Sequence, residues 1–155
     1  MFCLISINVF GFGSSVVVQM AQFGDDNLID TTILLEDGIL DILFDSGYIV
    51  TNFPVSTNKD YKVLEKEMIF DARAGYMNDI VYIGVKYYNS KSDTIITVAD
   101  IESVQVKIIN SKTKSVLFDG IIDGEQKGQY ETDITAVKHF ANSIGLEIKK
   151  QLGKI

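Results

Sequence analysis

The chain has 155 residues, 46% of them hydrophobic and 23% charged, a composition typical of a folded globular protein and not of a disordered one. With 21 acidic against 14 basic side chains, its formal net charge is -7. The overall field therefore repels phosphate backbones and anionic lipid headgroups, which argues against nucleic acid as a partner. A single cysteine, Cys3, excludes an internal disulfide.

The first stretch, residues 1–13, contains an apolar run with the length of a signal-peptide core, followed by the small residues Gly11 and Gly13. It lacks the basic residues that begin such a leader, and the residues before Cys3 form no lipidation signal. The run is also shorter than the ~20 apolar residues that cross a bilayer as a helix, so we expect no integral membrane span. Two interpretations stay open: a clipped secretory leader or an apolar N-terminal arm. We expect residues 14–155 to form a single domain.

The first half of this domain reads as strand, helix, strand. Residues 14–23 are apolar on both faces at their start, which is typical of a central strand covered on both sides. Polar residues at 25–27 are candidates for the cap of a helix, and Gly47 suits the position after its end near Ser46. Residues 48–53 follow as a second strand. A crossover of this length favours parallel pairing of the two strands.

The helix between these strands has two distinct faces. Its apolar residues are Leu28, Leu35, Ile39, Ile42 and Leu43. Its acidic residues are Asp30, Asp37, Asp41 and Asp45, at spacings that place them together on the opposite face. We expect these aspartates to form the solvated face of the helix. They are also the candidate partner-binding residues, as a docking surface for a basic partner.

The second half begins with a helix inside residues 57–79, where Leu64, Met68 and Ala72 recur every four residues. Three runs rich in Val, Ile, Tyr and Phe follow as strands, at residues 80–88, 94–109 and 115–122. We expect them to form an antiparallel meander. The polar residues 110–114 then form a hairpin loop that needs no glycine, with Asn110 supplying a turn-starting hydrogen bond.

A closing amphipathic helix follows a cap at Thr132 or Asp133. Its apolar stripe consists of Ile134, Val137, Ala141, Ile144, Ile148 and Leu152. We expect this stripe to cover the inner face of the meander, on which Val104, Val106 and Ile108 lie. The predicted fold class is α/β (α+β), a central mixed sheet of about five strands flanked by three helices in the order β-α-β-α-β-β-β-α.

The sequence carries no motif for phosphate binding, metal binding or nucleophilic catalysis. His139 is the only histidine, which excludes a multi-histidine metal site, and its helical position next to the apolar stripe indicates a boundary or surface residue and not a catalytic one. Asp25, Asp26 and Asp30 lack the spacing of a calcium loop. We therefore expect no catalytic residue, no cofactor and no metal. The tyrosines Tyr82, Tyr87 and Tyr88 fit either sheet packing or an aromatic recognition patch.

Two segments resemble a known family. Asp79, an apolar run and Gly84 match the start of a strand, and the hairpin residues Lys112, Thr113, Val116, Leu117 and Gly120 match a Lys-Thr-Gly-x-Val-Leu turn. The chain thereby resembles the bacterial cell-envelope proteins that include the curli secretion channel protein and the outer-membrane activator of penicillin-binding proteins, the CsgG/LpoB-like group. Three features depart from that pattern: Lys114 replaces the usual turn glycine, the first strand ends without Pro-Phe, and no lipidation signal is present.

The resemblance implies a periplasmic or secreted protein of a diderm bacterium that binds another envelope protein and does not catalyse a reaction. The long membrane-spanning hairpins of the channel are missing from the sequence, so a non-enzymatic accessory role as an assembly or activator module is expected. The alternative is a small cytoplasmic α/β enzyme or ligand-binding domain that uses carboxylates and backbone amides alone. The sequence predicts no oligomeric state.

Overall fold

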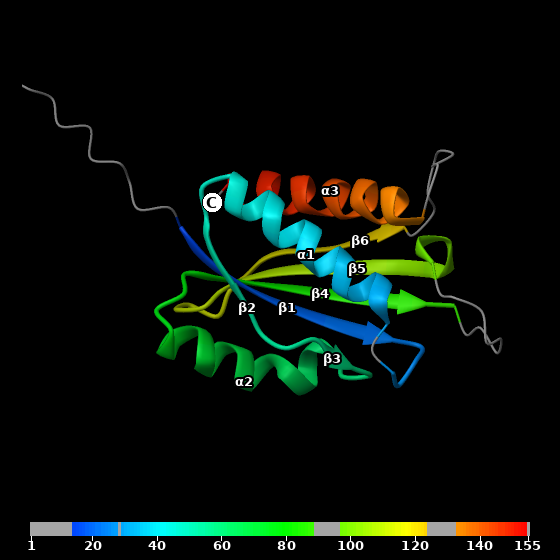
Figure 1. Cartoon of the computed structure of the whole chain (residues 1–155). Coiled ribbons are helices and arrows are strands. Elements are labelled where there is room, and N and C mark those ends of the chain that lie inside the picture. Colours follow the sequence, from blue (N-terminus) through cyan, green and yellow to red (C-terminus); the bar gives the residue numbers. More distant parts are fainter. Residues whose placement is uncertain (1–13, 28, 89–96, 124–132, 155) are drawn as a thin grey trace, which may run out of the picture.

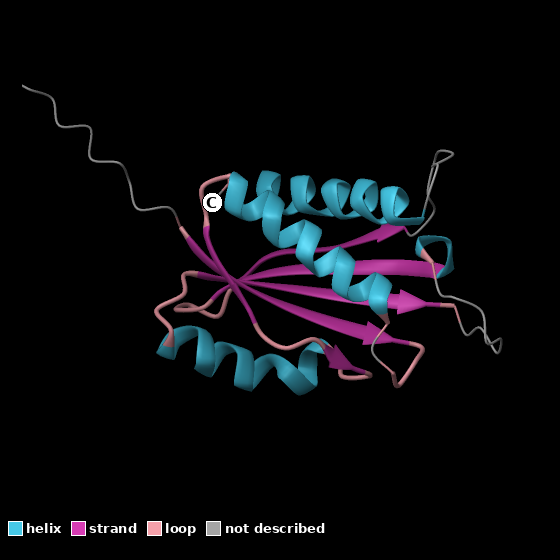
Figure 2. Ribbon diagram, viewed as in Figure 1, coloured by secondary structure: helices cyan, strands magenta, loops and turns pink. Residues whose placement is uncertain are grey.

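A computed structural model describes residues 14–27, 29–88, 97–123 and 133–154 of the chain. A six-stranded mixed sheet runs through the molecule, with the strand order β2-β1-β4-β5-β6 and a short β3 paired beside β1. Helices α1 and α3 lie on one face of this sheet and α2 lies on the other (Figures 1 and 2). The predicted fold class is confirmed, with β3 as an additional two-residue strand. The predicted leader or arm at residues 1–13 lies outside the described residues.

The elements follow one another in the predicted order. They are β1 (Ser15–Phe23), α1 (Asp30–Asp45), β2 (Ile49–Asn52), β3 (Ser56–Thr57), α2 (Tyr61–Ala74), β4 (Asp79–Tyr87), the 3-10 turn η1 (Val98–Asp100), β5 (Ile101–Asn110), β6 (Val116–Asp123) and α3 (Asp133–Leu152).

Strand β1 is central, as its apolar sequence predicts. It pairs in parallel with β2 and β3 on one side and with β4 on the other. Alternate side chains enter two separate cores: Val16 and Val18 pack under α1 and α3, whereas Val17 and Ala21 pack under α2. Burial on both faces explains why this strand lacks the alternation of a half-exposed one.

The start of α1 differs from the prediction, whereas its end agrees with it. The N-cap is Ile29 and not a residue of 25–27. Polar side chains upstream are used instead to shape the loop: Asp25 Oδ1 accepts a hydrogen bond from the Asn27 amide at 2.8 Å, and Gln22 Oε1 accepts one from the Ile29 amide at 2.9 Å. At the other end Gly47, with φ +88°, follows the cap residue as expected.

Helix α2 begins at a side-chain cap, since Asp60 Oδ1 accepts a hydrogen bond from the Val63 amide at 3.1 Å. The predicted stripe of Leu64, Met68 and Ala72 is buried against the sheet. The helix therefore covers β1 and β4, where its core partners include Ile80.

The antiparallel meander of β4, β5 and β6 is confirmed. The middle strand starts at Ile101, after η1, and residues 89–96 of the region before it lie outside the described residues. In the hairpin Asn110 Oδ1 accepts hydrogen bonds from the amides of Lys112 and Thr113, as its turn-starting role requires. Lys114, which stands in place of the glycine of the resembling family, has a φ of +63°.

Helix α3 covers the inner face of the meander as predicted. Val104, Val106 and Ile108 lie in one core cluster with Val137, Ala141, Ile144 and Ile148. Ile134 is an exception, because 59% of its surface is exposed. It lies at the edge of the apolar stripe, where the side chain borders α1 instead of the sheet.

Candidate functional site

The predicted acidic residues form one exposed surface along α1. Asp30, Asp37, Asp41 and Asp45, here called the acidic stripe, are all exposed. The opposite side of the helix is held in the core by Leu35, Ile39 and Leu43, each 0% exposed. Burial of these three side chains fixes the rotation of α1, so the sequence pattern alone orients the stripe outward.

Three of the four residues of the acidic stripe are unfavourable for an isolated helix, whereas Asp30, in the first turn, is favoured by the helix dipole. Among the described residues none of its carboxylates takes part in a salt bridge. Asp37, Asp41 and Asp45 repeat every four residues, a spacing at which like charges destabilise a helix by roughly 0.2–0.5 kcal/mol per pair. Asp45 also stands at the negative end of the helix dipole, and the last turn of α1 contains no basic residue. A cationic surface bound here would remove these repulsions.

A groove between α1 and α3 runs beside the acidic stripe. This α1–α3 groove has a volume of about 390 Å³ and is lined by Leu34, Asp37, Gly38, Asp41, Ile42, Ile134, Val137, Lys138 and Asn142. Leu34 and Ile134 are 43% and 59% exposed, so apolar side chains at its rim face solvent. The lining combines apolar side chains with two stripe carboxylates and one lysine, Lys138, which suits a partner that offers both an apolar and a basic side chain.

The sequence did not predict a second groove on the other side of the sheet. This α2–hairpin groove lies between α2 and the β5–β6 turn and is lined by Glu65, Lys66, Ile69, Phe70, Arg73, Ala74 and Lys114. Three of these residues are basic and one is acidic, the reverse of the charge of the whole chain. Phe70 is 71% exposed. The sequence gives one signal for this groove, the position of Phe70 on the polar side of an amphipathic helix.

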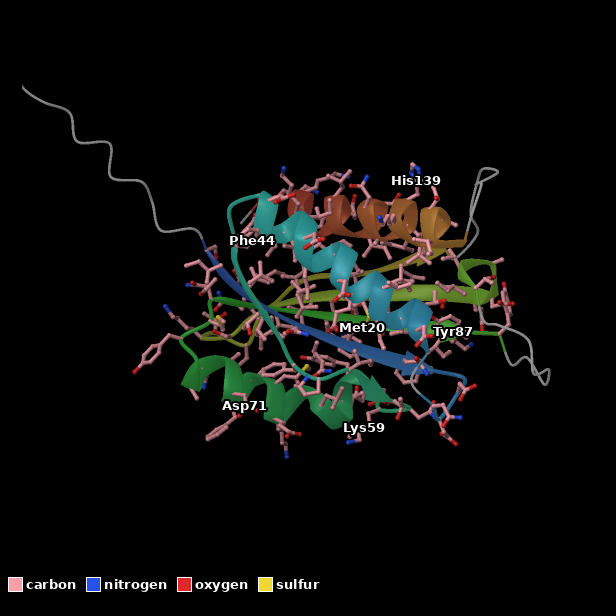
Figure 3. The ribbon with its side chains drawn as sticks, in the orientation of Figure 1. Met20, Phe44, Lys59, Asp71, Tyr87 and His139 are labelled. Carbon is pink, nitrogen blue, oxygen red and sulfur yellow. The ribbon has the colours of Figure 1, made fainter. Side chains whose placement is uncertain are left out.

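A third hollow, of about 380 Å³, lies between α2 and the segment around Pro54. Its buried polar group has a structural role: the Gln19 amide donates hydrogen bonds to the carbonyls of Met20 and Pro54, at 2.9 and 3.0 Å. Gln19 thus bridges the point where Pro54 separates β2 from β3. Its lining includes one basic residue, Lys59, and two acidic ones, Glu67 and Asp71, so charges of both signs face the hollow (Figure 3).

Two buried carboxyl groups have raised pKa values. Burial raises the pKa of Glu36 above its ordinary 4.5, and a hydrogen bond from Asn52 lowers it by less. Glu36 Oε1 is buried and has no hydrogen-bond partner among the described residues. Burial likewise raises the pKa of Asp79, which accepts hydrogen bonds from Asn110 and Ser14 at 3.3 and 3.4 Å. These groups lie in separate parts of the fold, so they form no acid–base pair.

The tyrosines and the histidine do not form a common site. Tyr82 and Tyr87 are 1% and 2% exposed and lie in the two different cores, so an aromatic patch with Tyr88 is excluded. Burial raises the pKa of Tyr87 to about 12, and its hydroxyl lies 2.8 Å from that of Thr32. His139 is exposed on α3, as expected for a surface residue (Figure 3).

In the part of the chain that the structure describes, no group of three or more His, Cys, Asp or Glu side chains is placed to hold a metal ion. Within the same residues no helix combines the length and apolar character needed to cross a bilayer.

The fold recurs in several bacterial proteins. A PelC dodecamer from Paraburkholderia phytofirmans matches with a TM-score of 0.54 at 15% identity, over 90% of this chain and 89% of that one. A second structure of that dodecamer matches with a TM-score of 0.50 at 13% identity, over 90% and 87%. TolB from Acinetobacter baumannii matches with a TM-score of 0.53 at 14% identity. The match spans 92% of this chain and 29% of the TolB chain. At these identities the likeness concerns the fold alone.

No curated protein matches the sequence. The finer resemblance to the CsgG/LpoB-like group is not among these findings and stays a prediction. A protein-family model described as "Uncharacterised protein" matches residues 15–153, nearly the whole described chain, and the protein therefore belongs to that family.

Proposed function

We propose that this protein is a non-enzymatic accessory protein of the bacterial envelope that acts by binding another protein. The binding surface is the acidic stripe together with the adjoining α1–α3 groove. The observation that carries the proposal is the position of Asp37 and Asp41 on the wall of that groove, without an ionic partner among the described residues. Such carboxylates weaken the helix that bears them and are explained by a cationic partner.

The fold supports the location. The chain shares its fold with PelC and TolB from two bacteria. We include in the proposal the periplasmic or secreted location that the CsgG/LpoB-like resemblance implies. Within it we place the role that the CsgG/LpoB-like resemblance implies, that of an assembly or activator module.

The chemistry of the surface defines the partner. Phe44 is 70% exposed at the end of α1 that also bears Asp45 (Figure 3). Leu34 is exposed at the α1–α3 groove. Exposed apolar side chains supply affinity when a partner covers them, whereas the carboxylates steer a basic surface to them and select it. The partner should therefore present lysine or arginine side chains around at least one apolar side chain.

Affinity capture from an envelope extract tests the proposal. The wild-type protein should retain one protein in stoichiometric amount, and the double variant Asp37→Lys/Asp41→Lys should lose it. A matched control is Glu67→Lys/Asp71→Lys, which changes the net charge equally at two exposed α2 positions with the same spacing. Capture of the partner by the stripe variant, or of no stoichiometric protein in several detergents, would count against the proposal.

A further inference from the structure

We infer that the partner of the α1–α3 groove is a second copy of this chain, which inserts Phe70 of its own α2 into the groove and faces the acidic stripe with Lys66 and Lys114. The inference rests on the proposed function, because it takes the groove and the stripe as a docking surface. It makes self-association head-to-tail, through two different surfaces of one chain.

The inserted residue is Phe70. It is 71% exposed on α2, and Val63, two turns earlier on the same side of the helix, is 65% exposed. Neither side chain takes part in the core under α2, which is filled by Leu64, Met68 and Ile69. An exposed phenylalanine on an otherwise amphipathic helix is the kind of residue that dominates the affinity of an interface.

Hydrogen bonds hold the two elements that surround Phe70 together. Arg73 reaches from α2 to the β5–β6 turn, where its Nε donates a hydrogen bond to the Ser111 carbonyl at 2.6 Å and its terminal nitrogen donates another to the Lys112 carbonyl. These bonds hold the turn against the helix, so the α2–hairpin groove is preformed. A preformed surface loses little conformational entropy on association.

The two surfaces are complementary in charge. Lys66 and Lys114 line the α2–hairpin groove and form no salt bridge among the described residues, and Asp37 and Asp41 line the α1–α3 groove in the same unpaired state. Each groove also holds one residue of the opposite sign: Glu65 in the first and Lys138 in the second. Those two are complementary as well. A basic, aromatic groove on a chain of net charge -7 therefore fits the acidic groove of the same chain.

The arrangement of the helices allows both surfaces to be used at once. Helices α1 and α3, whose side chains line the α1–α3 groove, lie on one face of the sheet, and α2 lies on the opposite face (Figure 1). A single copy cannot fill its own groove, because the sheet separates the two surfaces. One copy can still contact a neighbour on each side, and such heterologous contacts produce a closed ring or an open filament.

Sedimentation velocity of the purified protein over a series of concentrations and ionic strengths tests the inference. The wild type should associate reversibly, and less so at high salt, because exposed charges are screened. Phe70→Ala should weaken association by about tenfold or more, as expected for a central aromatic contact. Asp37→Lys/Asp41→Lys should weaken it as well. Ile121→Ala removes a side chain of nearly equal exposure, 72% against 71% for Phe70, from β6 and should leave association unchanged.

Mixing the two defective variants gives the decisive result. Phe70→Ala keeps an intact α1–α3 groove, and Asp37→Lys/Asp41→Lys keeps an intact Phe70. Each associates poorly alone, but the mixture should form a one-to-one dimer and nothing larger. Circular dichroism of each variant checks that it is folded.

Three results would overturn the inference: a wild type that stays monomeric, association that Phe70→Ala leaves unchanged, or a mixture that forms no dimer. If the protein stays monomeric and binds anionic lipid vesicles through Phe70, the α2–hairpin groove is a membrane-binding surface instead. A monomeric wild type that still captures a different basic protein through the stripe would leave the proposed function standing. A wild type that does not self-associate, together with capture that does not depend on the acidic stripe, would overturn both the inference and the proposed function.

Discussion

A methyl group placed on Gly38 of α1 would lie 2.7 Å from the Cβ of Ala141 on α3. The same close approach recurs where a Cβ on Gly145 would lie 2.9 Å from the Cβ of Ile42. Real Cβ atoms do not approach so closely, so the two glycines set the distance between α1 and α3. They thereby also set the width of the α1–α3 groove, whose lining includes Gly38 and Ile42.

Replacing Gly38 with alanine should destabilise the protein even though alanine is the better helix former. The gain in helix propensity is about 1 kcal/mol, whereas an added methyl group in a tightly packed contact costs about 1–3 kcal/mol. The contact atom belongs to Ala141, which has no flexible side chain to move aside. Urea denaturation should therefore show a net loss of up to about 2 kcal/mol.

Gly75→Ala is the matched control for that variant. Its Cβ would lie 3.4 Å from the nearest atom, the Asp71 carbonyl oxygen, which is an ordinary contact. This variant should differ from the wild type by less than about 0.5 kcal/mol. Equal effects of the two substitutions would show that close packing of α1 on α3 is not the cause.

Ile144→Asp should unfold the protein. Ile144 is 0% exposed and lies in the core between α3 and the meander. An unpaired carboxylate there costs several kcal/mol, comparable to the 5–15 kcal/mol stability typical of a domain. Lys112→Ala, in the exposed hairpin, should change the free energy of unfolding by less than about 0.5 kcal/mol. A variant with aspartate at 144 that denatures like its parent would refute the covering of the sheet by α3.

Lys114→Gly should stabilise the hairpin. The φ of Lys114 is +63°, a left-handed conformation that costs an L-residue roughly 1–2 kcal/mol and glycine almost nothing. Glycine loses more entropy on folding, so we expect a net gain of about 0.5–1 kcal/mol in thermal or chemical denaturation. Lys112→Gly, in the same loop but without positive φ, should instead lose a similar amount. Stabilisation by both substitutions would contradict a conformational origin.

Glu36 should make the protein more stable at mildly acidic pH than at neutral pH. Burial raises its pKa in the folded protein above 4.5, the value expected after unfolding. Between these two values the folded state binds more protons than the unfolded one, so the free energy of unfolding falls as the pH rises. Glu36→Gln should be more stable than the wild type at neutral pH and should show a flatter dependence above about pH 4.5.

Asp79 contributes a dependence of the same sign, because burial raises its pKa too. Asp79→Asn should therefore be measured in parallel, with the double variant, from about pH 4.5 to 7 by urea denaturation. If Glu36→Gln leaves the dependence of the free energy of unfolding on pH unchanged, ionisation of the Glu36 carboxyl group does not destabilise the folded protein.

Much of the fold could be predicted from the sequence because it depends on local periodicity. The continuous apolar run of β1, the four-residue spacing of Leu64, Met68 and Ala72, and the alternation in β5 each fix which side chains are buried. The outward direction of the acidic stripe follows from the same rule. The prediction failed at the start of α1, because Gln22 and Asp25 are used in tertiary and loop hydrogen bonds that no spacing reveals.

The sequence by itself determined the three helices and the five longer strands, their order, the two-sided burial of β1 and the existence of an acidic face. Only the tertiary structure decided what lies beside that face. The spacing of Ile134 predicts a core residue, yet it lines the α1–α3 groove with Leu34. The distance between α1 and α3 is set by contacts between residues about 100 positions apart in the sequence, such as Gly38 and Ala141. Phe70, Lys66 and Lys114 likewise line one groove in the tertiary structure, where Arg73 of α2 donates a hydrogen bond to the hairpin. Periodicity reports the surroundings of a residue only along its own helix or strand, whereas a groove is formed by two elements whose approach depends on packing across the sheet.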